Sequence, residues 1–233
     1  MATHLRDDIS AQATGDVCAA IASALDGDPA TKPLAPLWDA LAEKGDALAG
    51  QRRKLERALG RARARLTVAD TLWDAETSAF GRDVVNESDG RRDRPPYTRF
   101  FADVTPSDAQ TFGVNREVEQ GRAWIKELGR NPSESLSEKW TPRLTSATDT
   151  LEATSKERTT HLNALALHGT TELLFVGDIN LELDKLEGDL KKLFPGQPKR
   201  VASYLSVTKP RRRRASSEEE GAEDGAGGEV TSP

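Results

Sequence analysis

Cysteine is nearly absent from this chain, since Cys18 is the only one in 233 residues. One thiol cannot form an intramolecular disulfide or supply the several thiolates of a structural zinc site. Because Cys18 lies among alanines on an apolar stripe, we expect a small buried side chain rather than a nucleophile. A chain without disulfides suits a reducing compartment, and the expected location is the cytoplasm.

Aromatic residues are also scarce, at 5% of the sequence, whereas charged residues reach 30%. A β-sandwich needs many aromatic and β-branched side chains, so this balance disfavours an all-β fold. It favours long amphipathic helices whose exposed faces carry charges of both signs. The hydrophobic content of 36% is still enough for a substantial core in a chain of this length.

Long apolar runs are missing as well. Apolar runs such as residues 173–176 fall far short of the roughly 18 residues that a membrane-spanning helix needs. The amino terminus carries several aspartates and no continuous apolar stretch, so it does not match the pattern of a secretory signal. We therefore predict no membrane span.

Leucines at a seven-residue spacing are the strongest positive signal. The apolar series comprises Leu34, Leu41, Leu48 and Leu55 and then, after a step of four, Leu59, Leu66, Trp73 and Phe80. This heptad seam with a stutter predicts one long packed helix. Glycine weakens a helix by roughly 1 kcal/mol relative to alanine, so a kink or break is expected near Gly45, Gly50 or Gly60.

Further apolar stripes predict four more helices, approximately over residues 5–25, 107–129, 134–165 and 179–193. The stripe in the second of these comprises Val114, Val118, Gly121, Ile125 and Leu128. Pro142 is expected to kink or restart the third. The predicted fold is an all-α, elongated bundle of about five helices with heptad-type seams, followed by a disordered charged C-terminal tail.

This pattern divides the chain into four parts. Residues 1–85 hold an N-terminal helix and the long basic helix, and residues 107–195 hold helices that pack on it. Between them, residues 86–106 form a connection rich in proline, glycine and arginine that exceeds the usual length of about 2 to 8 residues. Residues 196–233 are basic and then acidic, and such a segment buries too little apolar area to offset its ordering entropy.

Catalytic motifs are not apparent, because the sequence has no phosphate-binding loop, nucleophile elbow, dinucleotide fingerprint or helix-borne zinc motif. One face of a helix would carry Glu157, His161, His168 and Glu172, which suggests a metal site. However, its two histidines would lie about 10 Å apart along the axis, so one ion would need ligands from another helix. A solvated polar face is the expected role, and we predict no metal, cofactor or small-molecule substrate.

A one-sided basic cluster occupies residues 51–66, with a net charge of +6. It contains one acid, Glu56, and the basic residues Arg52, Arg53, Lys54, Arg57, Arg61, Arg63 and Arg65. Such a cluster attracts nucleic acid, other polyanions or an acidic protein. The alternative is internal pairing with carboxylates of a neighbouring helix, for which the candidates are Glu117, Glu119 and Glu127.

Two further segments are rich in arginine. In the connection, arginines surround Tyr97, Phe100 and Phe101, an arrangement suited to stacking on single-stranded bases or, as we expect, to docking on the bundle. The tail contains the run Arg211, Arg212, Arg213 and Arg214, followed by six acidic residues between positions 218 and 229. The acidic stretch can neutralise this arginine run.

These observations predict a non-enzymatic helical interaction or scaffolding protein that acts through coiled-coil-like packing and binds a protein partner or a second copy of itself. The first alternative is binding of nucleic acid or another polyanion through helix 51–66 and the arginine-rich tail. The second alternative is a bundle enzyme with a metal site formed between helices.

Overall fold

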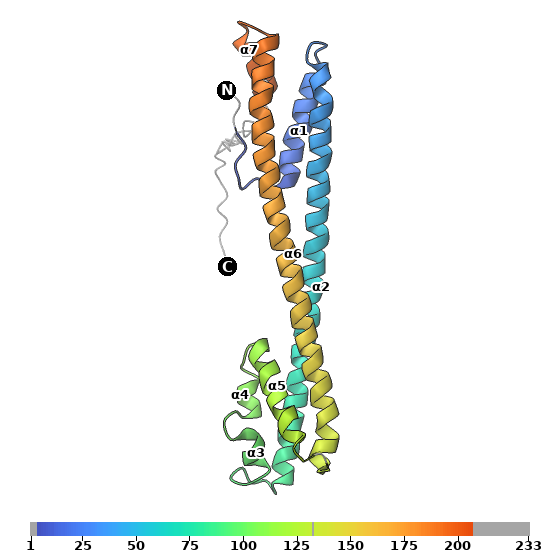
Figure 1. The fold of residues 1–233 in the computed structure, drawn as a ribbon, viewed down its shortest axis with the longest axis vertical. Helices are drawn as coiled ribbons and strands as arrows, with labels where there is room; N and C mark the ends of the chain where they lie inside the picture. The colour runs from blue at the N-terminus through green and yellow to red at the C-terminus, as the bar shows by residue number, and fades with distance from the viewer. Residues whose placement is uncertain (1–3, 132, 207–233) are drawn as a thin grey trace, which may run out of the picture.

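Two long helices dominate the computed structural model, which describes residues 4–131 and 133–206 (Figure 1). They run antiparallel along the molecule, with α1 beside them at one end and α5 at the other. No strand occurs among the described residues, so the predicted all-α bundle is confirmed. In chain order the elements are α1 (Ala11–Asp26), the 3-10 helix η1 (Lys32–Leu34), α2 (Ala35–Glu87), α3 (Tyr97–Phe101), α4 (Pro106–Ala109), α5 (Val114–Leu128), α6 (Ser135–Leu193) and α7 (Pro198–Leu205).

Ion pairs between α2 and α6 record a single antiparallel register. Residue numbers rise along one helix as they fall along the other, from one end of the molecule to the other. The pairs, with N···O distances between 2.5 and 3.9 Å, are Lys44–Asp178, Arg52–Glu172, Arg65–Glu157, Arg143–Glu76 and Lys139–Asp83. The two helices therefore keep one alignment along their shared length.

Buried apolar side chains form two separate clusters. The first, which we call the α1 core, holds α1 and α7 against the beginning of α2 and the end of α6, and it includes Trp38 and Phe175. The second, the α5 core, holds α3, α4 and α5 against the opposite ends of the same two helices, around Trp73 and Trp140. Each end of the molecule thus has its own hydrophobic core.

Between the two cores lies a segment that we call the stalk, made of residues 49–65 of α2 and 152–174 of α6. Neither core draws an apolar side chain from these ranges. Leu59 and Ala62 are nevertheless buried, because the two helices pack on each other there. Figure 1 shows α2 and α6 alone over this stretch, so their outer faces are open.

Close packing of α1 on α2 depends on two glycines that face each other at the crossing. The first turn of α1 is capped by Ser10, whose hydroxyl accepts a hydrogen bond from the Ala13 amide. A Cβ atom on Gly45 would lie 2.7 Å from the Cα atom of Gly15, a separation that real Cβ contacts do not show. The two glycines therefore permit the short distance between these helices.

Both long helices are continuous, which corrects the expectation of a break or restart in each. α2 is unbroken at Gly45, Gly50 and Gly60, near one of which a kink or break was predicted. The two helices expected over residues 134–165 and 179–193 are one helix, α6, which continues through Pro142. Packing explains this continuity, because the buried side chains of Trp140 and Leu144 hold the turns on both sides of the proline against the α5 core.

Other boundaries also differ from the prediction, since the first helix begins at Ala11 rather than near residue 5. The helix expected over residues 107–129 is divided into α4 and α5, because the chain leaves the helix between Ala109 and Val114. Beyond Leu193, where the last helix was expected to end, the backbone turns at Gly196 with a φ of 75° and forms α7. Tyr204 stacks on Phe194 with 6.0 Å between ring centroids, which holds α7 in the α1 core.

The connection rich in proline and arginine is docked on the bundle, as expected. Its aromatic residues Tyr97, Phe100 and Phe101 belong to α3 and are buried in the α5 core. Phe80 of α2 meets both phenylalanines edge-on, with ring centroids 5.2 and 5.5 Å apart. These rings are therefore covered by protein and do not present a face for stacking on bases.

Candidate functional site

The basic cluster lies on the stalk, and four of its arginines form a line along α2. They are spaced by four residues, so neighbouring positions are separated by about 6 Å along the helix axis. All are exposed, as is a lysine beside them. We call this set the arginine row, and it consists of Arg53, Lys54, Arg57, Arg61 and Arg65.

Apart from Arg65 at its end, which reaches Glu157 of α6, the arginine row occupies the side of α2 that faces away from α6. At 100° per residue, its centre lies about 140° from the side that contacts α6, which is formed by Leu55, Leu59, Ala62 and Leu66. Gly60 lies beside the row, and a Cβ atom there would meet no other atom within 4 Å. The row is therefore on an open, smooth surface.

Internal ion pairs account only for the edges of the basic cluster. Arg52 donates hydrogen bonds to Glu56 and Glu172 at 2.9 and 2.5 Å. Arg65 donates to Glu157 of α6 at 2.6 Å. Within the described parts of the chain, no ion pair or hydrogen bond involves the side chains of Arg53, Lys54, Arg57, Arg61 or Arg63.

The carboxylates predicted to neutralise this cluster are not its partners. Glu127 pairs with Arg99 and Arg130, and Glu117 is buried beside Asp70 and Asp74 of α2. The reason is that α5 packs within the α5 core and does not extend along the stalk (Figure 1). Sequence spacing alone could not show which stretch of α2 lies next to α5.

The stalk is strongly positive within an acidic chain. Its α2 part contributes +6 and its α6 part −1, so its net charge is +5, whereas the whole chain carries −5. Like charges four residues apart destabilise a helix by roughly 0.2–0.5 kcal/mol per pair. Among the described residues, only Glu157, which pairs with Arg65, forms an ion pair with the row.

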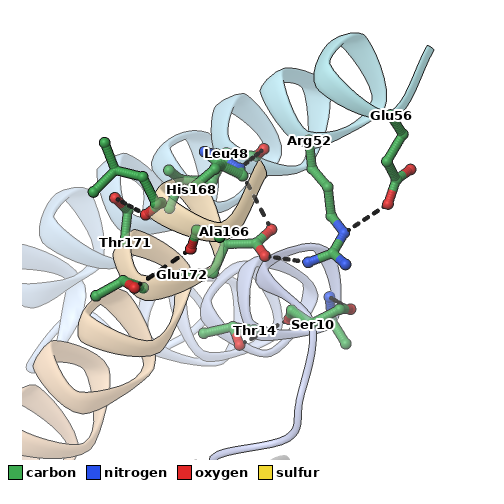
Figure 2. Close-up of polar contacts among 12 residues, drawn as sticks. Ser10, Thr14, Leu48, Arg52, Glu56, Ala166, His168, Thr171 and Glu172 are labelled. Atoms are coloured by element: carbon green, nitrogen blue, oxygen red, sulfur yellow. Dashed lines mark hydrogen bonds and ion pairs between the residues drawn. The ribbon is translucent and has the colours of Figure 1, made fainter. Parts of the chain in front are cut away.

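A buried polar cluster marks the end of the stalk next to α1 (Figure 2). His168 and Glu172 of α6 are only 9% and 7% exposed. The Nε2 atom of His168 lies 3.0 Å from the carbonyl oxygen of Leu48 on α2. Figure 2 shows the Arg52 guanidinium between the carboxylates of Glu56 and Glu172. Hydrogen bonding to these carboxylates, chiefly Glu172, raises the pKa of Arg52 and keeps it charged.

This cluster corrects the expectation of one solvated polar face on α6. The four residues form two separate pairs, in which His161 lies 3.8 Å from Glu157 and His168 lies 3.6 Å from Glu172. The second pair is buried between α2 and α6 rather than solvated. In residues 4–131 and 133–206, no group of three or more His, Cys, Asp or Glu side chains is arranged to hold a metal ion.

A buried carboxyl group on α5, Glu117, was not anticipated. Its side chain is 3% exposed and lies beside Asp70 and Asp74 of α2. Burial, then the hydrogen bond to Asp70 and the charges of both aspartates, raises the pKa of Glu117 to about 8. A signal existed in the sequence, because steps of three and four residues also connect Val114, Glu117, Gly121, Trp124 and Leu128.

Two other features bear on catalysis. Cys18 is fully buried, and this burial raises the pKa of its thiol to about 11, so the expected role of a buried apolar side chain is confirmed.

A hollow of about 560 Å³ lies between α2, α3 and α4, with Arg82, Arg92 and Tyr97 in its walls. Its lining includes no histidine, cysteine or carboxylate, so these side chains do not form an acid–base pair there.

Comparisons with models of protein families, with curated proteins and with solved structures found no match. No helix in the described ranges is long and apolar enough to cross a membrane.

Of the residues predicted to bind a partner, those in helix 51–66 are brought together on the stalk. Arg211, Arg212, Arg213 and Arg214 lie outside the described residues.

Proposed function

We propose that the protein is a non-enzymatic, elongated helical interaction protein that binds an acidic protein segment along its stalk. The observation that carries this proposal is the arginine row, four of whose five cations have no counter-ion among the described residues. The cationic side chains of the row repel one another, and none of them belongs to either hydrophobic core, so their positive charge is available to a partner.

The other helix of the stalk favours a protein over nucleic acid as the partner. Leu167 and Leu174 of α6 are 71% and 66% exposed, and Leu181 continues their seven-residue spacing. Exposed apolar side chains on α6 and exposed cations on α2 of the same elongated molecule suit a partner that carries both acidic and apolar residues. The chain's aromatic residues in the connection, which could stack on bases, are buried.

Coiled-coil-like packing is the expected mode of contact, since the exposed leucines repeat at the spacing that a partner helix would match. We expect the interaction to take place in the cytoplasm, which the single buried thiol suits.

Titration of the full chain with a labelled peptide rich in glutamate and leucine tests the proposal. The triple variant R53Q/R57Q/R61Q removes three unpaired charges of the arginine row. If each contributes about 0.5 kcal/mol, affinity at low salt falls about tenfold, which corresponds to about 1.4 kcal/mol. The matched control R82Q/K126Q/K199Q removes three exposed charges elsewhere and should bind like the unmodified chain.

Three outcomes decide the matter. Equal loss of affinity in both triple variants would mean that net charge, not the row, governs binding, and would contradict the proposal. So would the absence of any peptide binding at low salt. Duplex DNA serves as the competing probe, and tighter binding of DNA than of the peptide, lost in the row variant alone, would assign the surface to nucleic acid instead.

A further inference from the structure

We propose that the acidic segment 218–229 of the same chain occupies the arginine row and shields it from external partners. This inference rests on the proposed function, because both use the same row of cations. It adds a regulatory contact within the chain, in which a partner must displace the acidic segment before it can bind the stalk.

Charge complementarity between the two segments is the first argument. The acidic segment contributes six carboxylates, Glu218, Glu219, Glu220, Glu223, Asp224 and Glu229, and no basic residue follows position 214. On the stalk, helix 51–66 presents a net charge of +6, mostly without partners in the described structure. Each segment therefore supplies the charge that the other lacks.

The position at which the described chain ends is the second argument. Tyr204 of α7 donates a hydrogen bond to Asp28 at 2.6 Å, and Arg200 pairs with the same carboxylate at 2.5 Å. Because Asp28 precedes α2 closely, the chain leaves α7 at the end of the molecule where α2 begins. The acidic segment therefore starts its path from the correct end of the stalk helix.

Chain length allows the contact. From Ala35 at the start of α2 to Arg57 in the middle of the row, the helix extends about 33 Å. The 12 residues from Ser206 to Glu218 span up to about 40 Å when extended, and the later carboxylates reach further. The acidic segment can therefore lie along the whole row without complete extension of the preceding residues.

The magnitude of the effect follows from the short linkage. A segment tethered in this way has an effective concentration on the order of millimolar, so a contact with a Kd of about 0.1 mM would be about nine-tenths formed. An external acidic partner would then bind about tenfold more weakly than to an unshielded row. Exposed charges are screened at high salt, so the shielding should disappear there. The arginines at 211–214 compete for the same carboxylates and limit the effect.

Zero-length coupling of carboxylates to amines by a carbodiimide tests the contact directly in the full chain. Lys54 is the one amine within the arginine row, and the nearest lysines in sequence are Lys44 and Lys126. Mass spectrometry of the monomer should find Lys54 joined to a peptide from 218–229 at low salt, and much less of this product at high salt. The R53Q/R57Q/R61Q variant should reduce the yield, whereas R82Q/K126Q/K199Q should not.

A binding experiment separates the two proposals. The variant E218Q/E219Q/E220Q/E223Q/D224N/E229Q should bind the glutamate- and leucine-rich peptide about five to ten times more tightly than the unmodified chain at low salt. Unchanged affinity, or coupling of the acidic segment only to amines outside the stalk or only between two chains, would overturn the shielding contact. Peptide binding that is absent in both chains, although Lys54 still couples to the segment, would overturn the proposed function alone.

Discussion

Glu117 is the single residue that links stability to pH most directly. Its pKa is about 8 in the folded chain, against an ordinary value of 4.5. Between these two values the unfolded chain releases the proton while the folded chain retains it, so the folded state loses stability as pH rises from about 4.5 to about 8. In the E117Q variant this loss should be absent, and its unfolding free energy should exceed that of the unmodified chain increasingly toward pH 8.

Urea unfolding at several pH values between about 5 and 9 measures this difference. E119Q is the matched control, because Glu119 lies on the same helix and is exposed. If the unfolding free energies of E117Q and the unmodified chain run parallel across this range, Glu117 does not hold a proton in the fold.

Arg52 and Arg53 are adjacent and yet have opposite structural roles. Arg52 binds the buried carboxylate of Glu172, whereas Arg53 has no ion pair among the described residues. We expect R52A to lower the unfolding free energy by about 1–3 kcal/mol, because it leaves a buried acceptor without its donor. R53A should change it by less than about 0.5 kcal/mol. Equal effects in denaturant unfolding would contradict the assigned roles.

At the scale of elements, the contact between α1 and α2 depends on the absence of side chains. A Cβ atom at position 45 would meet the backbone of α1, including the carbonyl oxygen of Ala11 at 2.9 Å. G45A should therefore force the helices apart and lower stability by about 1–3 kcal/mol. G60A, in the open stalk, should instead raise stability by up to about 1 kcal/mol through helix propensity.

Thermal unfolding of the two glycine variants checks this contrast. A lower Tm for G45A and a higher Tm for G60A are the expected results. Stabilisation by both substitutions would show that α1 does not pack on α2 at this distance, since only propensity would then act.

At the scale of the whole molecule, the two cores share only α2 and α6. W140A removes a buried indole from the α5 core, and W38A removes one from the α1 core, each with an expected loss of about 3–5 kcal/mol. Because the stalk contributes few buried contacts, each substitution should mainly destabilise its own end.

Native-state hydrogen exchange distinguishes local from global loss. W140A should lower amide protection in α5 more than in α1, and W38A should do the reverse. The same pattern of loss in both variants would mean that the long helices transmit unfolding from one end to the other and that the molecule is one cooperative unit.

Much of the helical architecture could be predicted from periodicity. The apolar series from Leu41 to Phe80 lies within α2, and Leu34 ends η1 directly before it, because apolar residues at this spacing share one side of a helix and must be covered. The breaks considered at Pro142 and at the three inner glycines of α2 do not occur, since the cost of these residues is smaller than the gain from packing two continuous helices against each other. α7 was missed because its eight residues lie within the charged segment 196–233, which was predicted to be disordered as a whole.

The sequence by itself determined that the chain is helical and that one stretch of α2 carries a large excess of positive charge, because periodicity and charge are local properties. Only the tertiary structure decided which charges remain free. Arg52 is neutralised because residue 172, 120 positions away, lies beside it, whereas Arg53, one position on, points away from α6. The length over which α1 and α5 cover the long helices likewise depends on contacts between distant segments, and it is this length that leaves the stalk and its arginine row open.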